Sequence, residues 1–289
     1  MNLKIVLLAK QVPDTRNVDK NAMKEDGTVN RAALPAIFNP DDLNALEMAL
    51  QVKEAVPATE ITVITMGPPR AADIIRDAMF RGADKGYLLT DSKFAGSDTL
   101  ATSYALSMAV ARCKPDIIFC GVQAIDGDTA QVGPQIAEKL NMPQVTYAEK
   151  LVHVSKDKMR VIRRLTQGVE TVETTLPALV TVHSSAPVCR TRNAKLVMKY
   201  KHAHTSSELK NIDRNFTAIY QARPNLLIEE WNVQTIGAGI DKLGLAGSPT
   251  KVKKVDSIVF VQKESKKFSD ADADVEQMMV ELMESRIIG

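Results

Sequence analysis

The feature that most constrains this chain is an alternation of short apolar runs with longer stretches of helical spacing, which extends from residue 1 to about residue 142. Residues 5–9, 61–66, 87–89 and 117–121 have the length and apolar character of buried strands. Segments of helical periodicity separate them. This alternation is typical of a parallel sheet with helices on both faces, so it predicts a doubly wound α/β fold.

Helices are expected between these strands. Asn39, Pro40, Asp41 and Asp42 form a helix start signal, because proline suits the first turn and acidic side chains suit the positive N-terminus. Apolar residues recur at helical spacing behind it. The same pattern predicts further helices over residues 71–81, 98–112 and 129–140.

The pattern changes after Pro143. Residues 145–154, 160–165, 169–174 and 178–183 resemble consecutive strands joined by short turns, which predicts an antiparallel extension of the same sheet.

The remainder of the chain looks different again. Residues 184–257 are polar, basic and irregular in pattern, and a last helix is expected over 272–286. A tail of this kind suggests a C-terminal arm that wraps around a partner. The alternative is a poorly ordered surface arm.

Charge and cysteine content narrow the class of protein. The 37 basic and 35 acidic residues leave a formal net charge of +2, which gives no preference for nucleic acid. The apolar runs are far shorter than the roughly 20 residues that span a bilayer, so no membrane insertion is expected. Cys113, Cys120 and Cys189 show neither CxxC spacing nor an even number, which argues against disulfides and zinc and favours a reducing cytoplasm.

The densest chemical signal is the segment from Gly121 to Pro134, which lies between an expected strand and an expected helix. In a doubly wound sheet, ligands bind at the carboxyl ends of the strands, where helix N-termini present free amides to phosphates. Gly127 allows a tight turn, Thr129 can cap the helix or bind a phosphate, and Gln131 can reach a heteroaromatic edge. The same residues also suit an ordinary turn and helix cap.

Three other loops should open on the same edge of the sheet. Residues 10–13 follow the first expected strand, 66–69 follow the second, and 94–99 lead into the third helix. Asp98 and Thr99 are again natural cap residues, so each loop alone is weak evidence. Their convergence on one crevice predicts a nucleotide site.

Several motifs are absent from the sequence. It contains no GxGxxG after a strand, no Walker lysine loop and no GxSxG elbow. The four histidines lack metal-ligand spacing, and no acid/base set stands out, so we expect no catalytic residues and no metal site. A nucleotide crevice without a catalytic set suggests a carrier.

Six segments of the chain match the motifs of a known family in their order. They are residues 9–14, 39–42, 66–68, 78–84, 123–133 and 161–181, and the match resumes at 243–250. With these segments the chain resembles the β (small) subunits of electron-transfer flavoproteins. This resemblance implies an adenine-nucleotide hydrolase-like fold and a heterodimer with an α subunit that carries the electron-transferring FAD.

The resemblance also implies what the crevice holds, which is a second FAD or, in other members, a structural AMP. Residues 94–103 and 126–134 are similar to those of electron-bifurcating members, in which NADH reduces the β-subunit FAD; the flavin itself supplies the redox chemistry. Small side chains at Gly127 and Ala130 would leave room for a diphosphate. The predicted cofactor contacts are Leu8, Ala9, Lys10, Asn39, Pro40, Asp41, Asp42, Met66, Asp98, Thr99, Thr102, Gln123, Asp126, Gly127, Asp128, Thr129, Ala130, Gln131 and Val132.

One segment departs from the family pattern. Members often carry a Pro-Arg-Tyr loop that docks on a partner dehydrogenase, whereas this chain reads Ala-Pro-Val-Cys-Arg-Thr-Arg over residues 186–192. An apparent insertion follows, over about 199–230. A remodelled docking surface is favoured, because aromatic and arginine side chains are enriched at interfaces. A longer solvated arm is the alternative.

The sequence thus predicts three parts: a flavin-binding α/β domain (1–185), a docking loop with insertion (186–235) and a C-terminal arm with a helix (236–289). The expected function is electron transfer from NADH by bifurcation to the α-subunit FAD and to a flavin dehydrogenase or iron–sulfur oxidoreductase. The first alternative is a non-bifurcating carrier with structural AMP. A nucleotide-binding regulatory or adenylating protein would need a glycine-rich ATP loop that the sequence lacks.

Overall fold

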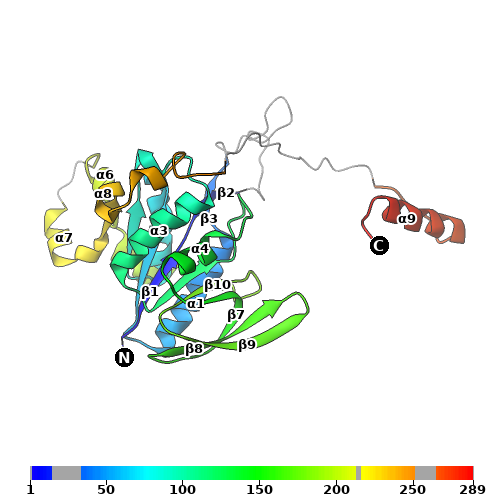
Figure 1. Ribbon diagram of the computed structural model, residues 1–289, viewed down its shortest axis with the longest axis horizontal. Helices are drawn as coiled ribbons and strands as arrows, with labels where there is room; N and C mark the ends of the chain where they lie inside the picture. The colour runs from blue at the N-terminus through cyan, green and yellow to red at the C-terminus, as the bar shows by residue number, and fades with distance from the viewer. Residues whose placement is uncertain (1, 15–33, 213–215, 251–264, 289) are drawn as a thin grey trace.

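The computed structural model describes residues 2–14, 34–212, 216–250 and 265–288. Its centre is a ten-stranded sheet in the order β11-β12-β5-β4-β1-β6-β10-β7-β8-β9, and a separate hairpin pairs β2 with β3 (Figure 1). The strands are β1 (Lys4–Leu8), β2 (Gln11–Pro13), β3 (Ala36–Phe38), β4 (Glu60–Met66), β5 (Lys85–Leu89), β6 (Ile117–Gly121), β7 (Gln144–Val154), β8 (Lys158–Leu165), β9 (Gly168–Thr175), β10 (Ala178–Val182), β11 (His204–Thr205) and β12 (Leu227–Trp231).

Helices cover both faces of the parallel part of the sheet (Figure 1). They are α1 (Pro40–Ala55), α2 (Ala72–Arg81), α3 (Thr99–Cys113), α4 (Val132–Lys139), α5 (Ala194–Tyr200), α6 (Ser206–Leu209), α7 (Thr217–Ala222), α8 (Val233–Ile236) and α9 (Asp272–Glu284). Single 3₁₀ turns occur at Pro69–Ala71, Ser92–Phe94, Pro224–Leu226 and Ile240–Lys242. The doubly wound prediction is confirmed.

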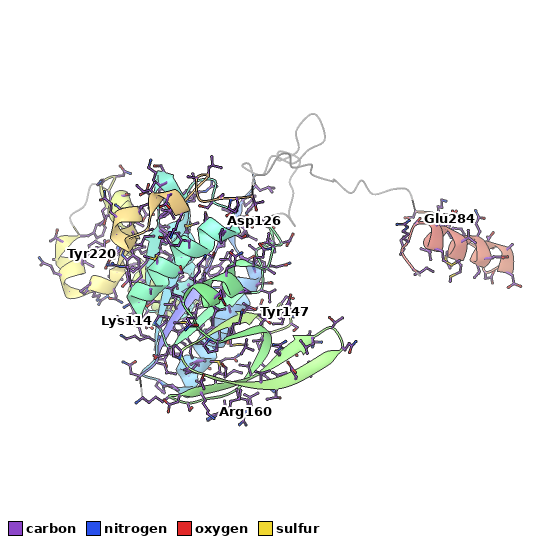
Figure 2. All side chains as sticks on the ribbon, in the orientation of Figure 1. Lys114, Asp126, Tyr147, Arg160, Tyr220 and Glu284 are labelled. Atoms are coloured by element: carbon purple, nitrogen blue, oxygen red, sulfur yellow. The ribbon has the colours of Figure 1, made fainter. Side chains whose placement is uncertain are left out.

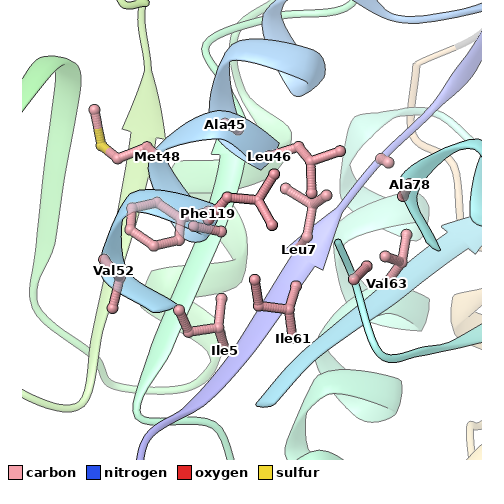
Figure 3. Close-up of a cluster of buried hydrophobic side chains, with 14 of the residues drawn as sticks. Ile5, Leu7, Ala45, Leu46, Met48, Val52, Ile61, Val63, Ala78 and Phe119 are labelled. Atoms are coloured by element: carbon pink, nitrogen blue, oxygen red, sulfur yellow. The ribbon is translucent and has the colours of Figure 1, made fainter. Parts of the chain in front are cut away.

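The strands alternate between two cores, as their period of two requires. Ile5 and Leu7 of β1 pack with α1 and α2, and Figure 3 shows them beside Leu46, Ile61 and Phe119. Val6 and Leu8 of the same strand belong to the core beneath α3 and α4. A strand buried on both faces reads as a continuous apolar run, which explains why β1, β4 and β6 were detectable in the sequence.

The expected antiparallel extension is only partly correct. β10 pairs in parallel with β6 on one side and with β7 on the other, so β7 and β10 both extend the parallel sheet. Only the β7–β8 and β8–β9 pairs are antiparallel. Irregular pairing of β7 with β8, between Ala148 and Lys150, accompanies the change from the sheet to the projecting hairpins of Figure 1.

The expectation of an irregular chain over residues 184–257 was wrong for several segments. β12 pairs in parallel with β5, and β11 pairs with β12, so the apparent insertion adds strands to the edge of the main sheet. Ile228 and Trp231 are buried there. The polar and basic composition of the surrounding chain hid this short strand, in which the buried residues are three positions apart rather than alternating. Whether the three-part domain division holds stays a prediction.

The predicted C-terminal helix is confirmed as α9, which buries none of its residues and lies apart from the α/β body in Figure 1. Its exposed apolar side chains include Val275, Met279 and Met283. Among the residues that the structure describes, no helix is long and apolar enough to cross a membrane.

Candidate functional site

The predicted cofactor contacts are distributed over loops at the carboxyl edge of the parallel strands. Leu8 ends β1 and Ala9 follows it, both buried; Met66 ends β4, and the segment from Gln123 to Val132 follows β6. The parallel register of β4, β1 and β6 brings these strand ends to one side. We call this region, formed by residues 8–10, 39–42, 66–67, 98–102 and 121–132, the carboxyl-edge site.

Asn39 ties the loop after β6 to the start of α1. Its side chain is fully buried, donates to the carbonyl of Gln123 at 2.8 Å and accepts from the amide of Ile125 at 3.2 Å. Its own amide donates to the carbonyl of Lys10 at 3.0 Å. Through its side chain and its backbone amide, Asn39 thus joins the loop after β6 and the residue Lys10 to the start of α1, and both of its buried side-chain polar atoms have a partner.

Asp42 performs a similar task one turn later. The buried carboxylate accepts hydrogen bonds from the amides of Gly121 (2.8 Å) and Lys10 (2.9 Å), the residues where β6 ends and β1 has just ended. Burial raises the pKa of Asp42 to about 7, against the opposing effect of these amide hydrogen bonds. Gly121 is required here, because a Cβ atom would lie 2.5 Å from the Cβ of Asp41.

Charged and polar side chains line the outer part of the same loop. The Lys10 ammonium lies 2.8 Å from both carboxylate oxygens of Asp126, and the Gln123 amide donates to Asp128 at 3.1 Å. About half of the Lys10 side chain is exposed (48%), so this ion pair is accessible from solvent. Figure 2 shows Asp126 at the margin of the body.

The loop between Gln123 and Val132 has an unusual backbone. Asp128 and Ala130 both adopt left-handed conformations, with φ of 49° and 53°. Such conformations are costly for residues other than glycine and cluster at ligand sites. Gly127 has no atom within 4 Å of an ideal Cβ position, so the space beside it is open.

The helix that follows begins without a side-chain cap. Gln131 occupies the N-cap position of α4, and its side chain makes no cap hydrogen bond; its Oε1 accepts instead from the Thr99 hydroxyl at 2.8 Å. The first-turn amides of α4 therefore lack a side-chain acceptor. Free amides at a helix N-terminus are suited to an anionic group.

The N-terminus of α3 is arranged differently. Asp98 caps it by accepting from the Ala101 amide at 3.0 Å, and its other oxygen accepts from the Thr250 amide at 3.1 Å. The Ser248 hydroxyl oxygen accepts a hydrogen bond from the backbone amide of Asp98 at 2.8 Å. Thr102 lies one turn into the helix. A role for Asp98, Thr99 or Thr102 in cofactor binding stays a prediction.

Sequence reasoning missed a polar network beside this site. The Glu149 carboxylate accepts from Arg164 Nε (2.6 Å) and from the Ser185 hydroxyl (3.1 Å), and that hydroxyl lies 2.8 Å from His183 Nδ1. Hydrogen bonding by Arg164 holds the pKa of Glu149 below its usual value. Tyr147, labelled in Figure 2, lies over the His183 ring at 5.9 Å. No motif connects these positions in the sequence, because they come together only through the position of β10 between β6 and β7 in the sheet.

The segment over residues 186–193, which we call the docking segment, is fastened to α1 and α2. Glu47 binds the Arg190 side chain at 2.7 and 2.9 Å and its amide at 3.0 Å, and Asn44 donates to the carbonyls of Ala186 and Pro187. Val188 remains 88% exposed. The segment therefore presents the exposed apolar side chains of Pro187 and Val188 on a fixed backbone.

Comparison with known proteins decides the family. The model of the electron transfer flavoprotein domain matches residues 26–204. An "Electron transfer flavoprotein subunit beta" of Thermoanaerobacterium thermosaccharolyticum is 40% identical over 284 residues, which cover 98% of this chain and 99% of the relative. This chain belongs to the electron transfer flavoprotein family, among its β subunits.

Two further relatives carry the names of reductase complexes. The "Caffeyl-CoA reductase-Etf complex subunit CarD" of Acetobacterium woodii is 39% identical over 251 residues, 86% of each chain. The "Acryloyl-CoA reductase electron transfer subunit gamma" of Anaerotignum propionicum is 41% identical over 257 residues, 87% of each chain. Membership implies an association with flavin and an α-subunit partner.

Proposed function

We propose that this chain binds FAD at the carboxyl-edge site and, with its α subunit, takes electrons from NADH by flavin-based bifurcation. The electrons pass to the FAD of the α subunit and to a partner, a flavin dehydrogenase or an iron–sulfur oxidoreductase. The two relatives named as parts of CoA-ester reductase complexes support such a partner. The three cysteines, all free thiols, are consistent with a reducing cytoplasm.

The observation that carries the proposal is the uncapped N-terminus of α4 beside the left-handed residues Asp128 and Ala130. These residues fit a diphosphate, because free amides, the Thr129 hydroxyl and the Lys10 ammonium are donors that phosphate oxygens accept. The open space beside Gly127 suits a ligand larger than a monophosphate.

Each residue then has a definite task. Lys10, now paired with Asp126, would neutralise phosphate charge, and the α4 amides would donate to the diphosphate. Asn39 and Asp42 hold the strand ends and the loop in register. When bound, FAD supplies both hydride acceptance and one-electron transfer, so the protein contributes binding, orientation and electrostatics.

The alternative, a carrier with structural AMP, differs in measurable ways. The test is to purify the chain with its native α subunit, to quantify FAD and AMP after acid release, and to titrate the complex anaerobically with NADH. The proposal expects two FAD per heterodimer and bleaching by NADH. One FAD with one AMP, and no bleaching, would establish the alternative.

A further inference from the structure

A cavity lies at the amino ends of the parallel strands, at the edge of the sheet opposite the carboxyl-edge site. It has a volume of about 350 Å³ and is lined by the beginnings of β1, β4 and β5, the end of α3 and Trp231 of β12. This volume is at the lower end of the range of about 300–1,000 Å³ for small-molecule sites. We call it the amino-edge cavity.

The two sites are far apart along the strands. Lys4 begins β1 and lines the cavity, whereas Ala9 follows the same strand at the other edge. Five strand steps correspond to roughly 15–20 Å. Figure 2 shows Lys114, which directly follows α3, and Asp126 of the carboxyl-edge site at different margins of the body. A ligand in one site therefore does not contact the other.

Cations dominate the walls of the amino-edge cavity. Lys4, Lys85 and Arg112 line it, against the single carboxylate of Glu60. Glu60 is already paired with Lys85 at 2.8 Å. Within the described ranges, neither the Lys4 ammonium nor the Arg112 guanidinium has a carboxylate within ion-pair distance. Two positive groups are thus available to an anionic ligand.

An aromatic pair fixes one of these cations. Tyr87 and Trp231 stack with ring centroids 3.9 Å apart, and the Arg112 guanidinium lies 5.5 Å from the Trp231 ring centre. Trp231 is itself held by a 3.0 Å hydrogen bond from its Nε1 to Glu229. A guanidinium positioned over a buried ring loses less conformational freedom when it binds a ligand, which strengthens each hydrogen bond.

Three features near the cavity work against an anion. Glu229 accepts from the indole of the lining residue Trp231, and the Asp116 carboxylate accepts from the backbone amide of Lys4 at 2.7 Å, so each of these two carboxylates has a partner within the chain. The carbonyl end of the α3 dipole also faces this side; the amide of Lys114 satisfies the Ala111 carbonyl, and Arg112 lies in the last turn. Burial raises the pKa of the Cys113 thiol to about 11, so this lining group stays uncharged at neutral pH.

We propose that the amino-edge cavity binds a small oxyanion, which is a carboxylate or a phosphate group. Arg112 and Lys4 bind its oxygens, and the Thr62 hydroxyl, which also lines the cavity, is a further donor. A planar, two-oxygen group fits the guanidinium fork. The proposal concerns residues outside the carboxyl-edge site, so it stands independently of the cofactor bound there.

The chain contains one tryptophan, Trp231, which provides a reporter inside the cavity wall. The complex of this chain and its α subunit is labelled with fluorotryptophan. The fluorine resonance of Trp231 is assigned as the one that disappears in the Trp231→Phe variant. The complex is then titrated with inorganic phosphate and with citrate, against chloride at matched ionic strength. We expect a saturable shift with at least one of the two oxyanions and none with chloride.

Matched variants connect that shift to the proposed ligands. Arg112→Gln should weaken the apparent affinity about tenfold, because it removes a charge-assisted hydrogen bond, and Lys4→Gln should weaken it less. Lys114→Gln, a neighbouring exposed lysine outside the cavity lining, should leave it unchanged. A response to phosphate alone assigns phosphate esters, and a response to citrate alone assigns carboxylates. No saturable shift, or one equally strong in Arg112→Gln, overturns the proposal.

Discussion

Two acidic side chains on helix α1 stabilise two different functional regions by opposite means. Asp42 faces the carboxyl-edge site and Glu47 faces the docking segment. Asp42 receives only neutral amide donors, and burial raises its pKa to about 7. Burial also acts on Glu47, but hydrogen bonds and charge from Arg190 outweigh it and hold the pKa of Glu47 below its usual value.

The difference separates the proposed ligand site from the predicted docking surface. The docking segment has its charges paired internally, since Arg190 binds Glu47 and Glu54, and Arg192 binds Asp77. The carboxyl-edge site keeps an accessible lysine, left-handed residues and an uncapped helix N-terminus. An exposed lysine whose ion pair is open to solvent, and helix amides without a side-chain acceptor, are available to a charged ligand, whereas half-buried ion pairs fix a backbone.

The largest effect is expected from Glu47→Gln. This change leaves the partly buried Arg190 guanidinium without its main anionic partner, so we expect a loss of about 2–3 kcal/mol in the free energy of unfolding. Urea unfolding of the complex measures it. The pKa of Glu47 is lower in the folded state than its ordinary value of 4.5. The carboxylate therefore stabilises the folded protein above pH 4.5, and this stabilisation is lost as the pH falls through the folded-state pKa.

Glu54→Gln is the matched control. Glu54 binds the same guanidinium at 2.5 Å, but its side chain is 62% exposed, so the loss should stay within about 0.5 kcal/mol. Equal losses of unfolding free energy in the two variants would show that the burial of Glu47 has no effect on the strength of its ion pair. The contrast drawn between Asp42 and Glu47 on α1 would then be wrong.

The next effect tests the open space at the carboxyl-edge site. Gly127→Val adds a branched side chain where no protein atom lies within 4 Å, so the free energy of unfolding should change little. If FAD occupies that space, its affinity should fall by at least about tenfold. Flavin absorbance after desalting measures occupancy. Gly127→Ala should lose less, and full FAD content in the valine variant would place the cofactor elsewhere.

A smaller effect concerns pH. Burial raises the pKa of Asp42 from its ordinary value of 3.8 to about 7. The contribution of Asp42 to stability is therefore greatest below pH 3.8 and is lost as the pH rises toward about 7. Between about pH 6 and pH 7 the wild type should lose about 1 kcal/mol relative to Asp42→Asn, which does not titrate. Unfolding curves of both proteins at the two pH values provide the comparison. Parallel pH profiles would contradict the raised pKa.

Local patterns predicted much of this molecule. The buried strands β1 and β6 are nearly continuous apolar runs, β4 is rich in β-branched residues, and the Asn39–Pro40 start of α1 carries its own signal, so all four elements were found. The position of β10 between β6 and β7 was not, because strand order depends on contacts that are distant in sequence. For the same reason the network of Glu149, Arg164 and Ser185 was missed.

For the carboxyl-edge site, the role of the named residues as cofactor contacts stays a prediction, and the sequence did not predict their contacts within the fold. Asp42 was expected to favour the helix N-terminus, yet its carboxylate binds the amides of Gly121 and Lys10 on neighbouring strands. Asp98 was expected as a cap and does cap α3, but its second oxygen binds Thr250, which is 152 positions away. A side chain's type limits its possible partners, and only the fold selects among them.

The smallest effect is expected from Val188→Ser in the docking segment. The side chain is 88% exposed, so its loss should not change the free energy of unfolding, whereas an apolar contact with a partner should weaken modestly. We expect the Michaelis constant of the partner oxidoreductase for the complex to rise about two- to fivefold, with NADH bleaching unchanged. Val152→Ser, an exposed valine on β7, is the control. If the Michaelis constant changes equally in both variants, the docking segment has no special role in binding the partner. The contact between Glu47 and Arg190 then contributes only to stability.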